Sequence, residues 1–486
     1  MRIIILIIFL IIDLFSNAID INTTKNFFEL DREGNINPSV YKILNKIEHD
    51  RSILCDKSRY NIYLIKEKLF DYSFEKNSEK LNDLKILINR AFNQYFYDLN
   101  HGCIKKENFL KILPQKENLD IQENLIYNNL LNALKKYVLI EKKGSWDKIE
   151  KNFYILKKGD SNQVIIKIKK RLKLSGDYKC ENIDNIFDQC LEDSVKIFQK
   201  RHGLKVDGKI GPETIKYMNI SLKDKILKIV LNIERLRWIL ENDNDFILIN
   251  IPDFSLDFFK NKHKTLHMKV IVGREDRQTP IMKDYIKYAV LNPYWKAPKT
   301  IVQKDILPKL QKRKFEYLKN KHIIASLDWD GNDTIEYENV DWSLYNADNI
   351  PFVFMQKPGP QNFLGFIKFI FPNSEDIYIH DTPEQNLFKY KKRAFSSGCI
   401  RVKKPIELFY NLYNLNSEKI TYRDILEKLV NKETKIIPFD KKIRVYILYM
   451  TAFVDDEGLI NFRDDIYNID KKMKDFIKQN GDFLVK

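Results

Sequence analysis

The spacing of apolar residues changes near Asp245, and this change limits the chain to few architectures. Before it, apolar residues recur at steps of three and four, as in residues 60–65 and 81–88, which is typical of amphipathic helices. After it, short runs such as 246–251 and 266–272 are rich in β-branched and aromatic residues and favour a sandwich or a barrel. Because 486 residues exceed the usual size of one domain, we expect a multidomain α+β protein.

Residues 151–220 carry the signals of three short helices. Apolar residues share a helical stripe over 164–172, a second amphipathic segment covers 191–199, and Pro212 stands at the first position of a third helix. The region also contains a short set of signature residues: Phe198, Gln199, Asp207, Gly208, Gly211, Pro212 and Thr214. With these residues it resembles the three-helix peptidoglycan-binding module, although the insertion 179–189 departs from that pattern. The alternative is a helical spacer that binds no ligand.

Residues 1–18 have the features of a secretory signal. Arg2 precedes an unbroken apolar run over residues 3–12, and residues 16–18 are small enough for cleavage. The run is shorter than the ~20 residues that span a bilayer. We therefore expect an exported, periplasmic protein, with an uncleaved inner-membrane anchor as the alternative.

Export makes the cysteines informative, because thiols pair in an oxidising compartment. Pairing Cys55 with Cys103 and Cys180 with Cys190 would keep each bridge inside one domain and leave Cys399 free. Other pairings, or five reduced thiols, remain open from the sequence alone.

The formal net charge of +16 suits an anionic polymer such as cell wall, nucleic acid or a membrane face. No arginine-rich tract, zinc-finger spacing or RNP-type motif is present, so nucleic acid is not an expected partner. The histidines are scattered, and the two that stand four residues apart, His263 and His267, fall in the β-rich part of the chain, so no metal site is expected.

The stretch 377–402 holds the clearest chemical constellation. A short apolar strand over 377–379 delivers His380, and a polar loop then presents Cys399. An imidazole within hydrogen-bond reach can take a thiol proton and lower the thiol pKa from ~8.5, which creates a nucleophile. Gly398 lets the backbone turn so that amide N–H groups point at an attacked carbonyl oxygen. The alternative is a buried core thiol and a surface histidine.

This stretch contains two short motifs, His-Asp-Thr-Pro at residues 380–383 and Arg-Ala-Phe-Ser-Ser-Gly-Cys-Ile-Arg-Val at residues 393–402. Together they resemble the active-site motif of the L,D-transpeptidases. These cysteine enzymes cross-link bacterial peptidoglycan. The match is to their large periplasmic branch, which also has serine before Gly-Cys, as Ser397 is here. The wider family often has histidine there, so His380 alone is carried over as the catalytic histidine.

The resemblance implies a β-rich, sandwich-like catalytic domain with a helical capping insertion, beside an α-helical scaffold and a three-helix peptidoglycan-binding-like domain. In the large branch the insertion covers the active site; the alternative is a surface decoration. The expected boundaries are a signal peptide at 1–18, the scaffold at 19–150, the peptidoglycan-binding-like domain at 151–220, a connecting helix at 221–243, the catalytic domain at 244–405 with its insertion at 297–347, and C-terminal helices and a hairpin at 406–486 that pack on the scaffold or catalytic domain.

The resemblance also implies the reaction, which needs no cofactor. Cys399 attacks the carbonyl that precedes the terminal D-Ala of a donor stem tetrapeptide, and His380 protonates the leaving amine. The side-chain amine of the diamino acid in a second stem then attacks the thioester and forms a 3→3 cross-link. Carbapenem-type inhibitors are expected to react with the same thiol.

Six further residues are assigned to the site. Tyr378 lies on the same strand face as His380, so its hydroxyl can assist, with a packed strand aromatic as the alternative. Arg401 can hold a substrate carboxylate or form a structural salt bridge. The expected oxyanion and support residues are Gly398, Ser397 and Tyr378, and the expected substrate-binding residues are Arg401, Trp295 and Phe395.

Two other functions stay open. The same fold and nucleophile would serve an L,D-carboxypeptidase, if water accepts the acyl group, or an enzyme that attaches proteins to the wall. A non-catalytic scaffold that binds peptidoglycan through residues 151–220 is the alternative from another class, and the His380/Cys399 pair counts against it.

Overall fold

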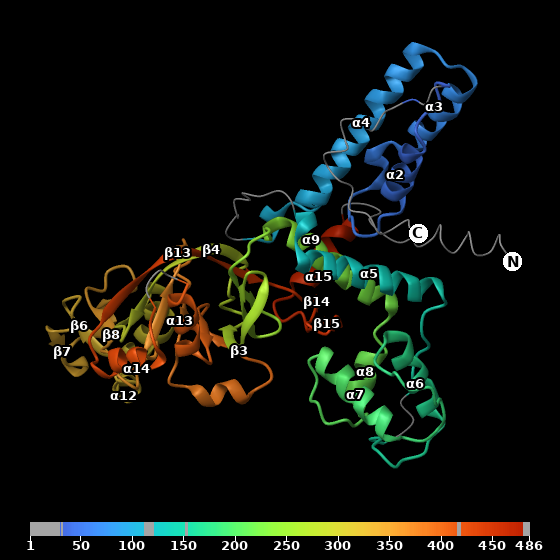
Figure 1. The fold of residues 1–486 in the computed structure, drawn as a ribbon. Coiled ribbons are helices and arrows are strands. Elements are labelled where there is room, and N and C mark those ends of the chain that lie inside the picture. The colour runs from blue at the N-terminus through green and yellow to red at the C-terminus, as the bar shows by residue number, and fades with distance from the viewer. Residues whose placement is uncertain (1–29, 31–32, 111–120, 151–153, 416–418, 480–486) are drawn as a thin grey trace. The chain divides into compact units, whose positions relative to one another are not determined.

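The computed structural model describes residues 30, 33–110, 121–150, 154–415 and 419–479, so the expected signal peptide lies outside the described residues. No helix within these ranges combines the length and the apolar character needed to cross a bilayer. The chain divides into two compact units, which are described separately (Figure 1). Unit 1 comprises Met1–Phe109, Gln115–Asn242 and Thr451–Lys486, and unit 2 comprises Leu110–Pro114 and Asp243–Met450.

Unit 1 begins as a helical scaffold, as predicted. Its helices are α2 (Pro38–His49), η3 (Lys57–Tyr60), α3 (Ile62–Phe74), α4 (Ser78–His101), η4 (Lys106–Asn108), η5 (Ile121–Glu123), α5 (Leu125–Lys142) and α9 (Leu222–Ile239). The α4 helix begins where the Asn77 side chain accepts the backbone N–H of Glu79 at 2.8 Å, and it ends at Gly102, whose φ of +81° is left-handed. Apolar side chains such as Ile65 and Ile88 are fully buried where the scaffold helices pack together.

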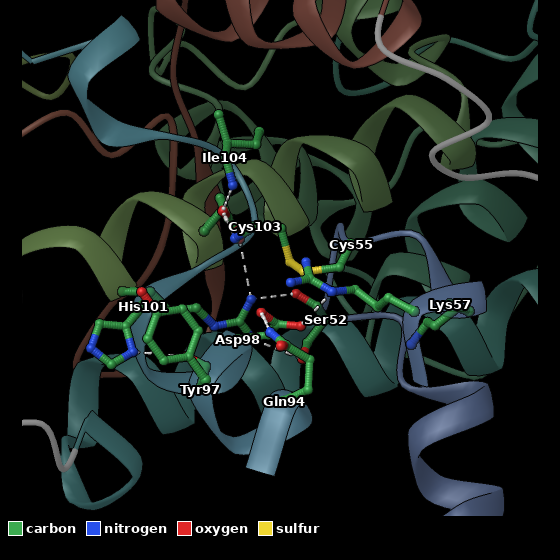
Figure 2. The surroundings of a disulfide bond; sticks show 12 residues. Ser52, Cys55, Lys57, Gln94, Tyr97, Asp98, His101, Cys103 and Ile104 are labelled. Carbon is green, nitrogen blue, oxygen red and sulfur yellow. Dashed lines mark hydrogen bonds and ion pairs between the residues drawn. A yellow bond between two sulfur atoms is a disulfide. The ribbon is translucent and has the colours of Figure 1, made fainter. Parts of the chain in front are cut away.

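Two disulfides lie in unit 1, Cys55–Cys103 in the scaffold and Cys180–Cys190 further along the chain. Figure 2 shows the first of them, with Ser52 beside it. Cys399 is the remaining, unpaired cysteine. Of the pairings that the sequence leaves open, the structure has the one that keeps each bridge inside one domain.

The peptidoglycan-binding-like region folds as three helices, α6 (Val164–Ser175), α7 (Gln189–Arg201) and α8 (Pro212–Met218). Phe198 is fully buried in their common core. The neighbouring Gln199 side chain accepts the backbone N–H groups of Asp207 at 3.0 Å and Gly208 at 2.9 Å. The Phe-Gln pair and the Asp-Gly turn therefore occur together, because the Phe198 side chain fills the core and the Gln199 side chain closes the turn.

Helix α9 carries charges into the interior of unit 1. The carboxylate of Glu234 accepts the backbone N–H of Cys103, and Arg237 donates to the Ser52 carbonyl oxygen at 2.8 Å. Glu234 and Arg237 are themselves 3.4 Å apart, and both are fully buried. Because an unpaired buried charge is costly, these contacts hold the helix against the scaffold.

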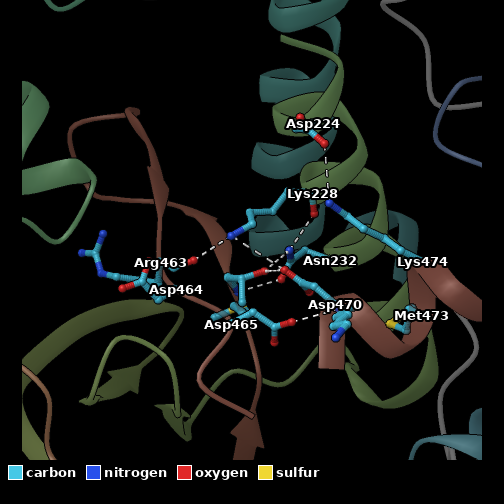
Figure 3. Close-up of polar contacts among 12 residues, drawn as sticks. Asp224, Lys228, Asn232, Arg463, Asp464, Asp465, Asp470, Met473 and Lys474 are labelled. Carbon is cyan, nitrogen blue, oxygen red and sulfur yellow. Dashed lines mark hydrogen bonds and ion pairs between the residues drawn. The ribbon is translucent and has the colours of Figure 1, made fainter. Parts of the chain in front are cut away.

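The C-terminal segment belongs to unit 1 and binds the other side of α9 (Figure 3). It consists of the antiparallel strands β14 (Ala452–Val454) and β15 (Ile460–Phe462), followed by α15 (Ile469–Gln479). Lys228 donates to the Arg463 carbonyl oxygen at 2.8 Å, and the Asp470 carboxylate accepts from Arg235 at 2.6 Å and from the Thr451 hydroxyl at 2.7 Å. The predicted connecting helix thus joins the scaffold to the C-terminal segment.

Unit 2 is built on a nine-stranded sheet. Its strands are β1 (Phe246–Asn250), β2 (Ser255–Lys260), β3 (His263–Gly273), β4 (Met282–Leu291), β9 (Ile367–Ile370), β10 (Ile379–His380), β11 (Ala394–Ser396), β12 (Ile400–Val402) and β13 (Lys435–Leu448). Their order is β11-β3-β12-β10-β9-β4-β13-β1-β2, and β2 also pairs with β3. Residues 263–269 of β3 pair with β2 and residues 270–271 with β12, so the sheet closes on itself. Helices α13 (Pro405–Tyr413) and α14 (Tyr422–Val430) precede β13.

Strand β13 differs from the expectation for the C-terminal region. We expected the catalytic domain to end at 405 and a hairpin to lie within 406–486, outside the sheet. Instead β13 pairs with β1 and β4 inside the sheet, and only residues 452–454 form the hairpin with β15. Alternation along one continuous apolar run does not reveal where that run changes partners.

The insertion between β4 and β9 has a core of its own. Its elements are β5 (Trp295–Lys296), α10 (Lys299–Ile301), η6 (Val302–Ile306), α11 (Leu307–Gln311), α12 (Phe315–Asn320), β6 (Ile324–Ser326), β7 (Thr334–Ile335), η7 (Tyr337–Asn339), η8 (Trp342–Leu344) and β8 (Val353–Gln356). A four-stranded sheet, β5-β8-β6-β7, packs with the helices around Leu310, Trp342 and Phe354. The sequence predicts a helical insertion at 297–347. The structure adds strands too short to show alternation and extends the core to Leu364.

Candidate active site

Three adjacent strands bring the candidate residues together. Strand β10 lies between β9, with which it runs antiparallel, and β12, with which it runs parallel. His380 is opposite Lys368 on one side and Arg401 on the other. Residues directly opposite each other on neighbouring strands project to the same face. Lys368, His380 and Arg401 therefore form one row across the sheet, and Cys399 lies at the start of β12.

The turn before Cys399 is held by side chains on both sides. Gly398 has a φ of +120°, and a Cβ atom there would lie 3.1 Å from Ile377 Cδ1. The Thr279 hydroxyl donates to the Gly398 carbonyl oxygen at 2.6 Å, and the Ser396 hydroxyl donates to the Cys399 carbonyl oxygen at 2.6 Å. The N–H of Gly398 donates to Ser396 Oγ at 3.2 Å. The conformation of this turn requires glycine.

Cys399 is half-buried at the end of this turn. Its Sγ lies 3.8 Å from the backbone carbonyl oxygen of Asp376. Burial raises the pKa of the Cys399 thiol. Hydrogen bonds with the backbone and side chain of Tyr378, and then the positive charges of Lys368 and Arg401, oppose that rise. The charge state of the thiol is thus controlled by a small set of neighbours.

His380 is 4% exposed and keeps one tautomer. Its Nδ1–H donates to the backbone carbonyl oxygen of Asp381 at 2.5 Å, which leaves Nε2 as the acceptor. Burial, the positive charge of Arg401 and, to a smaller extent, that of Lys368 lower the pKa of His380 to about 3. Within the described residues no hydrogen bond joins His380 to Cys399. The imidazole is therefore a neutral neighbour of the thiol at physiological pH.

Two of the predicted support residues are Tyr378 and Ser397. The backbone carbonyl oxygen of Tyr378 accepts the N–H of Ile400 at 3.0 Å, next to Cys399, and the Tyr378 ring meets the His380 ring edge-on with centroids 5.6 Å apart. Burial raises the pKa of Tyr378 well above its usual value, so the hydroxyl keeps its proton. Ser397 is exposed, and its Oγ accepts a hydrogen bond from Arg277 at 3.0 Å.

The three expected substrate-binding residues lie in different environments. Arg401 donates to Glu384 at 2.5 Å, which is the salt bridge that was the alternative to carboxylate binding. Trp295 is 4% exposed and packs edge-on against Phe363 in the core of the insertion, so its ring presents no free face to a ligand. Phe395 is 38% exposed. Of the two aromatic residues, only Phe395 is open to solvent.

Sequence reasoning missed two cations of the site. Arg277 donates to both carboxylate oxygens of Asp305, at 2.5 and 2.9 Å, as well as to Ser397. Since Asp305 belongs to the insertion, Arg277 joins the insertion to the turn before Cys399. Lys368 is the second cation, and its only sequence signal is a charged residue inside the apolar run 366–371.

Two segments of the chain match known families. Residues 244–437 match the family described as L,D-transpeptidase catalytic domain, and residues 161–218 match the one described as "Putative peptidoglycan binding domain". The predicted resemblance and fold class are confirmed: the chain combines a β-rich catalytic domain of this type with a helical peptidoglycan-binding domain and a helical N-terminal region.

Individual proteins agree with the family matches. A Haemophilus influenzae protein named "Putative L,D-transpeptidase" is 34% identical over 247 residues, which cover 51% of this chain and 48% of that protein. The chain therefore spans about half the length of this curated relative. Solved L,D-transpeptidases from Stackebrandtia nassauensis and Xylanimonas cellulosilytica are 12% and 13% identical, cover 60% and 62% of this chain, and are themselves covered to 94% and 100%. Their TM-scores of 0.24 and 0.18 are too low to add to the argument.

Proposed function

We propose that this chain, which carries an L,D-transpeptidase catalytic domain and a peptidoglycan-binding domain, is a cysteine transpeptidase that forms 3→3 cross-links in peptidoglycan. The observation that carries the proposal is the free thiol of Cys399, presented on a glycine turn one strand away from the neutral imidazole of His380. A nucleophile and a base on neighbouring strands suit acyl transfer through a covalent intermediate.

The reaction proceeds in two balanced steps. The Cys399 thiolate attacks the carbonyl carbon between the third residue of the donor stem and its terminal D-Ala. The C–N bond breaks, D-Ala leaves as an amine that takes up a proton, and a thioester remains. The side-chain amine of a second stem then attacks the thioester, so an amide forms and the thiol is released. One amide replaces another, so no cofactor is needed.

The residues around the thiol have distinct roles in this scheme. Nε2 of His380 is free to accept the thiol proton and to return it to the leaving amine, because Nδ1–H is bound to Asp381. Tyr378 lies beside Cys399, since its backbone carbonyl oxygen accepts the N–H of Ile400, and its hydroxyl would orient the sulfur. The backbone N–H of Cys399, with Ser397 beside it, is the expected donor to the developing oxyanion, because the N–H of Gly398 already donates to Ser396 Oγ.

The peptidoglycan-binding domain supports a polymeric substrate. We infer that it keeps the catalytic domain close to the wall, where stem peptides are the donors and acceptors. Such a substrate lies outside the cytoplasm, in agreement with the secretory signal expected at residues 1–18. Carbapenems, whose strained amide is a carbonyl electrophile, are expected to acylate Cys399.

The experiment that tests the proposal uses protein without residues 1–18 and disaccharide-tetrapeptide as the substrate. Product masses are compared with those formed by the Cys399→Ala variant. A cross-linked dimer that has lost one D-Ala, absent with the variant, supports the transpeptidase.

Other products would change the assignment. Disaccharide-tripeptide alone would point to an L,D-carboxypeptidase. Transfer to an added protein amine, without stem dimers, would point to attachment of proteins to the wall. No product and no carbapenem adduct on Cys399 would leave a non-catalytic wall-binding scaffold.

A further inference from the structure

Lys368 occupies an unusual place for a lysine. It lies in β9, an interior strand of the sheet, with the fully buried Ile367 and Phe369 on either side of it in the chain. Its side chain is half-buried, and its ammonium nitrogen lies 4.4 Å from the centroid of the Tyr378 ring. The backbone carbonyl oxygen of Tyr378 accepts the N–H of Ile400 at 3.0 Å, next to Cys399, so the ammonium group lies near the candidate nucleophile.

The other cations near Cys399 already have partners. Arg401 is bound to Glu384, and Arg277 is bound to Asp305. Lys296 lies over the ring of Trp329, 4.8 Å from its centroid.

In the part of the chain that the structure describes, Lys368 forms no ion pair with a carboxylate. Burial lowers the pKa of Lys368, the thiolate form of Cys399 and then Asp376 oppose that fall, and Lys296 adds to it. Its charge is therefore available to the sulfur.

His380 is poorly placed to supply the positive charge itself. It stands between Lys368 and Arg401 in the row across three strands. A third positive charge in that row would be repelled by two permanent ones and would be desolvated as well. An ion pair of thiolate and imidazolium, common in cysteine enzymes, is therefore disfavoured in this site.

We propose that Lys368 is the counter-charge that stabilises the Cys399 thiolate, while His380 handles the proton as a neutral base. The inference rests on the proposed role of Cys399 as the nucleophile. The S–H bond breaks, the proton leaves through Nε2 of His380 to water, and the electron pair stays on the sulfur beside the ammonium group. Lys368 acts through space on the sulfur and is a positioning residue, since no contact with the reacting carbon is required.

The test measures alkylation of Cys399 by iodoacetamide between pH 5 and pH 10. The other four cysteines are in disulfides, so labelling reports on one sulfur. Loss of the ammonium in Lys368→Met should raise the apparent thiol pKa by about one unit, which lowers the rate at pH 7 about tenfold. Lys368→Arg, which keeps the charge, should restore most of the wild-type profile.

Matched variants separate charge from packing. Lys442→Met removes a lysine from the neighbourhood of a different tyrosine ring, that of Tyr285 at 5.9 Å, and should leave the profile unchanged. Lys368→Gln repeats the test with a polar neutral side chain, in case Met disturbs the packing against Tyr378. Thermal unfolding of each variant shows whether the fold is retained.

The proposal is overturned if Lys368→Met and Lys368→Gln fold but keep the wild-type profile, or if Lys368→Arg shifts it as far as they do. Neither result bears on the transpeptidase assay, because alkylation uses no peptidoglycan substrate. Conversely, a protein that makes no cross-links but shows the predicted shift would retain the electrostatic role and lose the proposed function.

Discussion

His380 and Cys399 are both neutral at rest, but their pKa values are shifted in opposite directions. The imidazole is neutral because burial and the row of cations lower its pKa to about 3, and the thiol is neutral at rest because burial raises its pKa. The ionisation that controls reactivity is therefore that of the sulfur.

This difference predicts a simple pH dependence for acylation. Between pH 5 and pH 9 the rate of carbapenem acylation should rise with pH and follow one ionisation, that of Cys399, with no step near the usual histidine pKa of ~6.5. Mass spectrometry of the adduct against time gives the rate. A step near pH 6.5 that disappears in His380→Gln would contradict the neutral imidazole.

Gly398 offers a second test at the scale of one residue. Alanine there must adopt a φ of +120° and meet Ile377 at 3.1 Å, at a cost of about 1–3 kcal/mol of folding free energy or a distorted turn. We expect Gly398→Ala to slow alkylation of Cys399 more than tenfold. Gly211→Ala is the control, because Gly211 lacks a positive φ and its nearest contact is at 3.7 Å. Equal rates for wild type and Gly398→Ala would refute the role of this turn.

Part of this site could be predicted from the sequence. Cys399 and His380 lie in two short motifs whose residue types state the chemistry directly. Lys368 and Arg277 could not be found in the same way, because their roles depend on strand register and on contacts across the fold. A lysine in an apolar run indicates only that its side chain lies in an environment unusual for lysine.

At the scale of elements, helix α9 illustrates what an amphipathic pattern leaves open. The sequence predicts a helix over 221–242, and the structure has one over Leu222–Ile239. The pattern does not identify its partners, which are the scaffold on one side and the C-terminal segment on the other. Strand β13 shows the same limit. Its apolar sequence predicts that it is buried but does not identify the strands with which it pairs.

The buried ion pair on α9 predicts a large effect on stability. Glu234→Ala should lower the free energy of unfolding of unit 1 by about 3–5 kcal/mol, because the buried Arg237 loses the Glu234 carboxylate and the N–H of Cys103 loses its acceptor. Urea denaturation followed by circular dichroism measures the change. Glu181→Ala is the control, since its exposed ion pair with Lys173 should contribute little. A similar stability for both variants would show that the buried pair is dispensable.

At the scale of the whole molecule, the division into two units predicts that their stabilities can be altered separately. Replacing Cys180 and Cys190 together by serine removes a cross-link from the peptidoglycan-binding domain, at a cost of about 2–4 kcal/mol to that domain. Binding to purified peptidoglycan in a pull-down should fall at elevated temperature. Alkylation of Cys399 in unit 2 should keep its wild-type rate, and a parallel loss of reactivity would contradict independent units.

The overall architecture could be predicted in outline, because the switch in apolar period separates helical from β-rich structure. The pattern of apolar residues does not predict that unit 2 interrupts unit 1 along the chain. The chain leaves unit 1 after Asn242 and rejoins it at Thr451. Thr451 lies inside residues 444–454, which have the pattern of one continuous strand. Such an arrangement depends on pairings between distant residues, and local periodicity does not contain them.

The order of the cysteines has a consequence for how the protein matures. Each paired cysteine bonds to the next one along the chain, Cys55 to Cys103 and Cys180 to Cys190. A chain that crosses a membrane N-terminus first would therefore expose each correct partner before any wrong one, and oxidation in order of emergence would produce the native bridges without reshuffling. On that route Cys399 would emerge last, when no other thiol is left to capture it, and would reach its turn in the reduced form that the proposed chemistry requires.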